Sequence, residues 1–164
     1  MHKKHGKFYY SPSDLTRFME SPFASWMDRF AIDCPDQAPE RDPEDALANT
    51  LVQRGYEHED TLEEEFSDKD LSICTITGES PSEKRERTLA AMQAGTDVIV
   101  QARLENDIFG GYADFLIKVP GASELGNFHY EVWDTKLSSK AKPSFVVQLC
   151  CYAEMLETIQ GRQP

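Results

Sequence analysis

The sequence is best understood from one stretch, Tyr130-Glu131-Val132-Trp133-Asp134-Thr135-Lys136. Aromatic and β-branched residues dominate this stretch, which predicts a β-strand. Side chains two positions apart on a strand share a face, so the Asp134 carboxylate and the Lys136 amine should lie side by side. An acid and an amine at the end of a strand are unusual in a hydrophobic core, and they indicate a candidate site.

An earlier strand-like run, residues 111–119, carries a second acid, Asp114. The segment between the two runs, residues 120–127, contains Pro, Gly, Ser and Asn, which are typical turn residues. If the two strands fold back about Glu124, Asp114 falls opposite Asp134. Two carboxylates and one ammonium group then converge on a patch that suits a hard cation and a water to be activated.

Length and composition indicate one domain spanning residues 1–164. No apolar run approaches membrane-spanning length, and no signal peptide follows the basic start, so a cytoplasmic protein without a membrane partner is expected. The net charge of −12 argues against a nonspecific nucleic-acid coat, because such binding neutralises phosphates. It does not exclude nucleic acid as a ligand, since a metal site must itself carry carboxylates.

The first half of the chain is predicted to be helical. A helix capped at Ser11 continues to Phe30 with a kink at Ser21-Pro22, and its aromatic stripe is expected to pack in the core. After a proline-rich loop, a second helix runs from Asp42 to Phe66 and carries His58 on its inward face. Taken alone, His58 is better explained as a core histidine than as a metal ligand.

The second half predicts an α/β arrangement. A strand at 71–77 and a helix at 80–95 precede a three-stranded meander at 97–105, 111–119 and 128–137. Alternation places Val98, Val100, Ala102 and Leu104 on one face of the first meander strand, and Ala113, Phe115, Ile117 and Val119 on one face of the next. A last helix at 144–160 is apolar nearly all round, so it should lie buried against the sheet.

Asp114, Asp134 and Lys136 together suggest chemistry at a metal ion. Two carboxylates from neighbouring strands can share one Mg²⁺, which polarises a phosphoryl oxygen and lowers the pKa of a bound water. Lys136 can orient that water and stabilise negative charge in the transition state. The competing interpretation for Asp134 and Lys136 alone is a surface ion pair on an edge strand.

Other side chains could complete such a site. His58 could be an added ligand, and a nitrogen ligand would favour Mn²⁺ over Mg²⁺. Gln148 and Tyr152 are four residues apart on the last helix and share a face, from which they could hydrogen-bond the lysine, a carboxylate or a phosphate. Glu59 and Glu105 are weaker candidates.

Five short motifs occur in order along the chain: Ser11-Pro12-Ser13-Asp14-Leu15 with Glu20-Ser21-Pro22-Phe23, then Gly55-Tyr56-Glu57-His58, Gly111-Tyr112-Ala113-Asp114, Asp134-Thr135-Lys136 and Gln148-Leu149-Cys150-Cys151-Tyr152. Their order and spacing resemble those of the RecB-like branch of the PD-(D/E)XK nucleases, and bacterial RecB-family nucleases are the most similar members. The resemblance implies a restriction-endonuclease-like core, in which helices flank a central mixed sheet with a strand meander.

The same resemblance implies a DNA nuclease, a phosphodiesterase that depends on Mg²⁺ or Mn²⁺ and belongs to DNA repair. The implied metal ligands are His58, Asp114 and Asp134. The implied catalytic residues are Lys136, Asp134 and Asp114, with Gln148 and Tyr152 supporting the site or contacting substrate. The implied partners are DNA and, in a longer parent protein, a helicase or a further domain.

The sequence departs from the family pattern in two ways. Ser21 stands where many relatives carry a cysteine, and Cys34, Cys74, Cys150 and Cys151 lack CxxC spacing, so no iron–sulfur cluster is expected. The family core also continues with another strand after the last helix, so we expect a domain whose last core strand is missing. Two alternatives therefore stay open: a noncatalytic or truncated module of this fold that binds DNA or a partner, and an unrelated acidic interaction domain in which Asp114 and Asp134 never meet.

Overall fold

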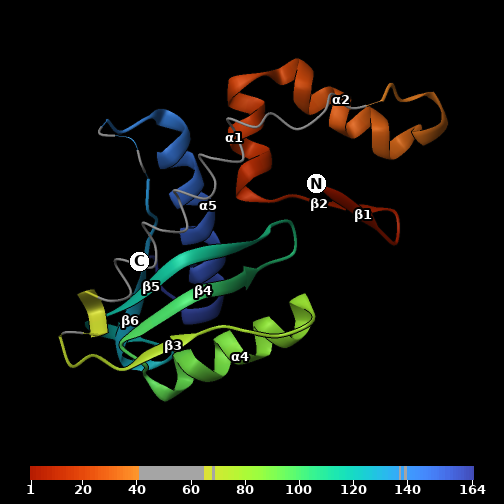
Figure 1. Cartoon of the computed structure of the whole chain (residues 1–164). Coiled ribbons are helices and arrows are strands. Elements are labelled where there is room, and N and C mark those ends of the chain that lie inside the picture. The colour runs from red at the N-terminus through yellow and green to blue at the C-terminus, as the bar shows by residue number, and fades with distance from the viewer. Residues whose placement is uncertain (41–64, 68, 137, 139) are drawn as a thin grey trace.

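Four strands form a mixed sheet at the centre of the molecule (Figure 1). The computed structural model describes residues 1–40, 65–67, 69–136, 138 and 140–164. In these residues β3 (Ile73–Thr75) pairs in parallel with β4 (Val98–Glu105), while β4, β5 (Gly110–Ser123) and β6 (Gly126–Trp133) form an antiparallel meander. The strand order is β3-β4-β5-β6, which confirms the predicted α/β class and the meander.

The β5–β6 hairpin has the register expected from the sequence. Ser123 pairs with Gly126, so the chain reverses at Glu124 and the next residue; the register then shifts between Ser123 and Pro120, and from Pro120–Phe128 to Phe115–Trp133 it is constant. The turn is tightened by Gly126, whose φ of 134° is a conformation that other residues rarely adopt. One step beyond the Phe115–Trp133 pair, the same register brings Asp114 opposite Asp134.

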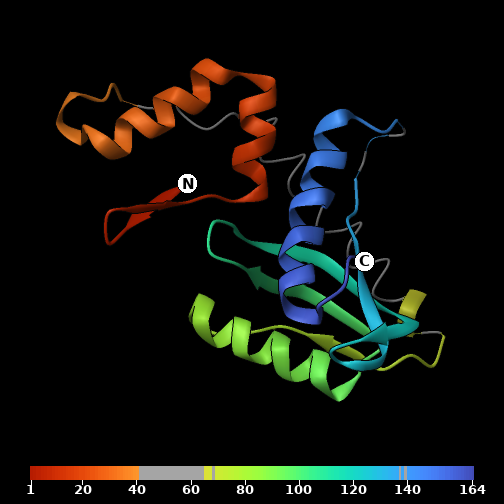
Figure 2. The same ribbon diagram turned by 180° about the vertical axis from the view of Figure 1, so that it is seen from behind.

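Helices α4 (Pro81–Ala94) and α5 (Pro143–Gln160) pack into one core with the sheet (Figures 1 and 2). Ser80 caps the start of α4, and Gly95 ends it in the left-handed conformation, as the sequence indicates. The core contains Ala91 and Met92 from α4, Cys151, Tyr152, Met155 and Leu156 from α5, and Ile99, Ala102, Leu104, Ala113, Leu116 and Tyr130 from the strands. A smaller cluster forms from Phe66, Val98, Val100 and Phe115.

The predicted alternation along β4 and β5 is wrong at one point. Gln101 has a φ of 54°, a left-handed conformation that interrupts the two-residue alternation of a strand. Val98 and Val100 therefore belong to the smaller cluster, whereas Ala102 and Leu104 belong to the main core. The partner strand changes in the same way: Ala113 and Leu116 pack in the main core, and Phe115 and Ile117 pack in the smaller cluster.

This change of face occurs beside the candidate site. The pairs Val100–Phe115 and Ala102–Ala113 keep one register, and Gln101 stands opposite Asp114 between them. Asp114 therefore lies where β4 and β5 both change the face that packs against the main core.

Helix α5 uses one of its faces for burial. Cys151, Met155 and Leu156 are buried, whereas Val146 is 55% exposed. The helix therefore lies buried against the sheet through one face, as predicted, although its apolar residues on another face are partly exposed. At the end of α5 the buried side chain of Gln160 accepts a hydrogen bond from the backbone N–H of Tyr130 and donates one to the backbone carbonyl of Tyr130. Gln160 thus pairs backbone groups of β6, the edge strand of the described sheet, that have no neighbouring strand on that side.

The N-terminal region contains elements that the sequence only partly predicts. An unpredicted hairpin of β1 (His2–Lys4) and β2 (Lys7–Tyr9) leads through Tyr10, which pairs with Phe109, into α1 (Pro12–Glu20). Ser11 and Asp14 form the capping box of α1. Ser21 ends α1 and caps α2 (Pro22–Asp33), so the predicted kink is a break between two helices. A short 3₁₀ turn follows at Pro35–Gln37.

The aromatic stripe of these helices does not pack in the core as expected. Phe23 is 70% exposed and Trp26 56% exposed, and Trp26 stacks between Phe23 and Phe30. Leu15, near the start of α1, does pack against the main core. The reason is visible in Figure 1: α1 lies beside α5, but α2 turns away from the sheet.

The predicted helix at 42–66 lies outside the described residues, apart from a helical turn at 65–67. None of the helices in the described part of the chain is both long and apolar enough to span a membrane.

Candidate functional site

Asp134 lies at the end of β6 and has a protein partner on each carboxylate oxygen. Its Oδ2 is 2.6 Å from Nζ of Lys136, and its Oδ1 accepts a hydrogen bond of 3.3 Å from Nε2 of Gln148 on α5. The Asp134 side chain is only 3% exposed, whereas Lys136 is 31% exposed and lies over the ring of Phe145. A buried carboxylate is thus paired with an ammonium group that reaches solvent.

Asp114 is joined to the same segment through Thr135. The backbone N–H of Thr135 donates to Oδ2 of Asp114 at 2.9 Å, and the Thr135 hydroxyl is 3.3 Å from the same oxygen. Thr135 lies between Asp134 and Lys136 in the sequence, so the segment 134–136 contains Asp134 and also contacts Asp114. Sequence reasoning missed this role, because on a regular strand Thr135 would face away from its two neighbours; β6 ends at Trp133, and the alternation ends with it.

Tyr152 connects the helix to the strand that carries Asp114. Its hydroxyl donates to the backbone carbonyl of Tyr112. Burial raises the pKa of Tyr152; the hydrogen bond with Gln148 acts in the opposite direction, and the carboxylates of Asp114 and Asp134 raise the pKa further. Tyr152 is therefore a neutral phenol, and both carboxylates lie near enough to act on it.

The approach of the helix to the strand depends on Gly111. A Cβ atom at this position would lie 2.8 Å from Cδ of Pro12 and 3.1 Å from Cε1 of Tyr152. Both distances are too short for ordinary packing, so the glycine allows α1 and α5 to meet over the start of β5.

The structure therefore brings together five of the six side chains selected from the sequence, namely Asp114, Asp134, Lys136, Gln148 and Tyr152. The sixth, His58, lies outside the described residues, as does Glu59. Glu105 instead forms ion pairs with Arg85 and Arg103, at 3.3 Å and 3.2 Å. Gln101, opposite Asp114, is a further polar residue that the sequence did not single out.

The donor chemistry of the site fits a divalent cation. Carboxylate oxygens are the preferred ligands of Mg²⁺ and also suit Mn²⁺. Thr135 and Gln148 hold the two carboxylates in place, as outer partners do for metal ligands. In the residues that the structure describes, no three His, Cys, Asp or Glu side chains group closely enough to hold a metal.

None of the four cysteines, all of which lie in the described part of the chain, forms a disulfide. All four are free thiols, and burial raises the pKa of Cys151 to about 12, so its thiol stays protonated. Cys150, its neighbour on α5, faces solvent.

A cavity of about 490 Å³ opens beside the site. Tyr112, Gln148, Tyr152, Arg103 and His2 are among the residues that line it. A ligand in this cavity would reach Gln148, whose amide is bonded to Asp134.

Comparison with known proteins adds no assignment: no family model matches the chain, and no curated protein or solved structure shows a significant match. The function of the site must therefore be inferred from its geometry.

Proposed function

We propose that this chain is a nuclease domain that hydrolyses phosphodiester bonds of DNA with Mg²⁺ or Mn²⁺, on a restriction-endonuclease-like core. The observation that supports it best is the convergence of Asp114, Asp134 and Lys136, which the pairing of β5 with β6 and one connecting residue, Thr135, bring to the same end of the sheet. An ion pair formed by chance on an edge strand would not need a second acid opposite it.

Asp114 and Asp134 would hold the cation in this proposal. When bound, the cation neutralises charge on the phosphate and activates water for attack. Gln148 fixes the carboxylate of Asp134 from the helix side, and Thr135 fixes that of Asp114 from the strand side. Both acids would then be oriented before substrate arrives, which avoids a reorganisation cost during the reaction.

Lys136 would act on the phosphate. Its ammonium group is partly exposed, so it can contact a phosphate oxygen while it remains beside Asp134. In hydrolysis the water oxygen bonds to phosphorus, the bond from phosphorus to one sugar oxygen breaks, and that oxygen takes up a proton. Negative charge on the phosphate oxygens grows in the transition state, and a fixed cation stabilises it most at that point.

Tyr152 would support the site as a neutral hydrogen-bond donor. Because it donates to the carbonyl of Tyr112, it positions the strand two residues before Asp114. We assign it a positioning role in this proposal.

The proposal is tested by incubating labelled single-stranded and double-stranded DNA with the protein in Mg²⁺, in Mn²⁺ and in excess EDTA. We expect cleavage in either metal and none in EDTA. Lys136→Ala should lower the single-turnover rate at least about a hundredfold, whereas Lys140→Ala, which removes an exposed lysine four residues away, should not. A fully active Lys136→Ala protein would exclude this mechanism.

A second candidate is a noncatalytic DNA-binding module of the same fold. It is favoured by the protein partners on both oxygens of Asp134, and by the lack of a third ligand in the described residues. DNA binding without cleavage in either metal, together with undetectable Mn²⁺ binding by calorimetry, would select this candidate. For either candidate a cytoplasmic location is part of the proposal.

A further inference from the structure

We propose that one face of the N-terminal hairpin, together with Arg103, forms a groove that binds the phosphate backbone of a nucleic-acid strand leading away from the candidate catalytic site. This inference rests on the nuclease proposal for the direction of the strand. It concerns binding by residues outside the catalytic set, so it can be tested separately.

The composition of the hairpin is the first observation. Residues 1–7 contain three lysines and two histidines and no acid, in a chain whose net charge is −12. A polyanion is repelled by most of such a surface, so binding needs a local concentration of cations. The hairpin provides such a concentration of cations next to the β4–β5 turn. Backbone hydrogen bonds of Tyr10 with Ile108 and Gly110 join the end of the hairpin to this turn.

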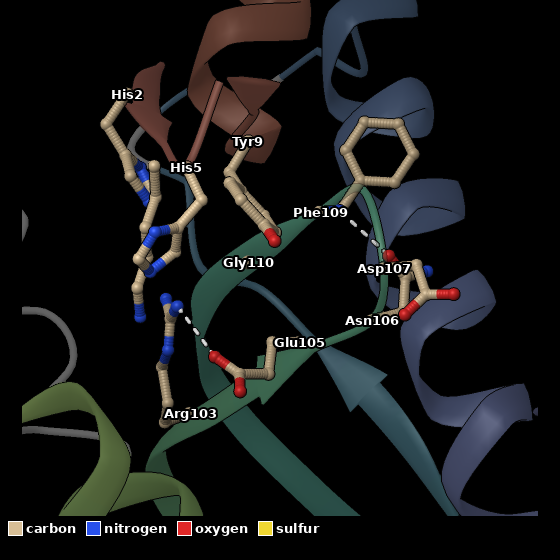
Figure 3. A pocket seen from close by; sticks show the side chains of 10 residues that line it. His2, His5, Tyr9, Arg103, Glu105, Asn106, Asp107, Phe109 and Gly110 are labelled. Carbon is tan, nitrogen blue, oxygen red and sulfur yellow. Dashed lines mark hydrogen bonds and ion pairs between the residues drawn. The ribbon is translucent and has the colours of Figure 1, made fainter. Parts of the chain in front are cut away.

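The two faces of the hairpin differ. One face packs on α2: Lys3 forms an ion pair of 2.8 Å with Asp33, and Phe8 lies under the guanidinium of Arg29. The other face carries Lys4, His2 and Tyr9, which line a cavity of about 440 Å³ together with His5 from the turn (Figure 3). The polar groups of the first face are engaged within the fold, whereas Lys4 on the second face lines a cavity.

The opposite wall of this cavity adds an arginine whose position is fixed. A Cβ atom at Gly110 would lie 2.5 Å from Nη2 of Arg103, so the glycine makes room for the guanidinium group. That group is 5.1 Å from the ring centroid of Tyr112, and its Nη2 is 3.2 Å from Glu105. Among the described residues, nothing accepts a hydrogen bond from its buried Nε atom. An arginine held in this way is suited to bind phosphate.

Two acids, Glu105 and Asp107, line the cavity with two cations, Lys4 and Arg103, and Arg85 adds a third cation from outside the lining. Glu105 is shared by Arg103 and Arg85, so it is matched by two guanidinium groups. Asp107 is the other carboxylate in the wall. The side chain of Asn106 accepts bonds from two backbone N–H groups of the turn and serves the fold.

The groove is continuous with the cavity that reaches Gln148 and Tyr152, beside the candidate catalytic site. His2, Arg103 and Gly110 line both this cavity and the one that reaches Gln148 and Tyr152. A strand whose phosphate lies at the aspartates could therefore pass Tyr112 and Arg103 and reach the hairpin. The exposed ring of His2, stacked on Tyr9, offers a flat surface for a base.

The test is the affinity for a fluorescently labelled single-stranded oligonucleotide, measured by anisotropy in EDTA so that cleavage plays no part. Lys4→Gln and Lys3→Gln remove the same charge from adjacent positions of the hairpin, but only Lys4 lines the cavity. We expect Lys4→Gln to weaken binding roughly threefold to tenfold and to lower the slope of log affinity against log salt by about one. Lys3→Gln should change neither quantity by more than a small amount.

Arg103→Gln is a second variant, checked for folding by its melting temperature because this side chain is mostly buried. It should weaken binding as Lys4→Gln does. The proposal is overturned if the wild type does not bind DNA at about 50 mM salt, if the two lysine variants bind alike, or if poly-glutamate binds in a Lys4-dependent way and DNA does not. Lys4-dependent binding without cleavage in Mn²⁺ would support the groove and contradict the nuclease proposal. Cleavage in Mn²⁺ together with binding that does not depend on Lys4 would support the nuclease proposal and contradict the groove.

Discussion

Gln148 on helix α5 donates a hydrogen bond of 3.3 Å to Oδ1 of Asp134 at the end of strand β6. Asp134 is buried, and its other oxygen is paired with Lys136. The bond therefore couples the docking of the helix to the orientation of the carboxylate that the proposed cation needs.

Replacing Gln148 with Leu should lower metal-dependent DNA cleavage roughly tenfold to a hundredfold, because an outer partner of a ligand is lost. The Mn²⁺ affinity should fall with it. Glu154→Leu, on an exposed position of the same helix, is the matched control and should cleave at the wild-type rate. A Gln148→Leu protein with normal Mn²⁺ affinity and rate would contradict the coupling.

Thr135→Val should reduce cleavage by a smaller factor, roughly threefold to tenfold, because the backbone N–H of Thr135 still holds Asp114 after the hydroxyl is gone. Thr135→Ser keeps the hydroxyl and should restore the rate. If serine and valine behave alike in single-turnover assays, the hydroxyl has no part in positioning Asp114.

Gln160→Leu should destabilise the fold by about 2–4 kcal/mol, because the N–H and carbonyl of Tyr130 both lose a buried partner. The free energy of unfolding is measured by urea denaturation. Gln163→Leu, at an exposed position nearby, should stay within about 0.5 kcal/mol of the wild type. Equal stability of the two variants would show that the hydrogen bonds between Gln160 and the backbone of Tyr130 do not stabilise the fold.

The lowered pKa of Asp97 predicts how the stability of the fold depends on pH. Its hydrogen bonds with Lys118 and Ser72 lower its pKa from 3.8 to about 2. A carboxylate whose pKa is lower in the folded state stabilises the fold above its unfolded pKa, and this contribution disappears as the pH falls through the folded pKa. The contribution of Asp97 should thus be complete above about pH 4 and be lost towards pH 2.

Asp97→Asn removes this titration. Wild type and variant should differ in free energy of unfolding near neutral pH, and the difference should shrink as the pH falls from about 4 to 2. A difference that stays constant over this range would mean that the hydrogen bonds do not depend on the charge of Asp97.

Much of the site follows from local sequence patterns. The turn residues around Glu124 predict the hairpin in which Asp114 lies opposite Asp134, and helical spacing places Gln148 and Tyr152 on the face of α5 that meets the strands. Such features depend on residues close in sequence, so periodicity and turn chemistry are enough to predict them.

Other features depend on tertiary structure. The left-handed conformation of Gln101 has no signature in its residue type, and it reverses the faces of two strands. The exposure of Trp26 follows from the direction in which α2 leaves α1, which the helical stripe alone does not indicate. The N-terminal hairpin did have a local signal, because His5 and Gly6 both adopt positive φ at its turn, as Gly in a two-residue turn suggests.

The most direct test of the central claim is the single-turnover rate of Mn²⁺-dependent DNA cleavage by Asp134→Asn, compared with Glu131→Gln. Glu131 is a carboxylate three residues earlier on the same strand, where it pairs with Ile117. We predict that Asp134→Asn cleaves at least about a thousandfold more slowly than the wild type, because a ligand of the cation is lost, and that Glu131→Gln cleaves at the wild-type rate. If the two variants cleave equally fast, Asp134 does not belong to a hydrolytic centre and the account is wrong.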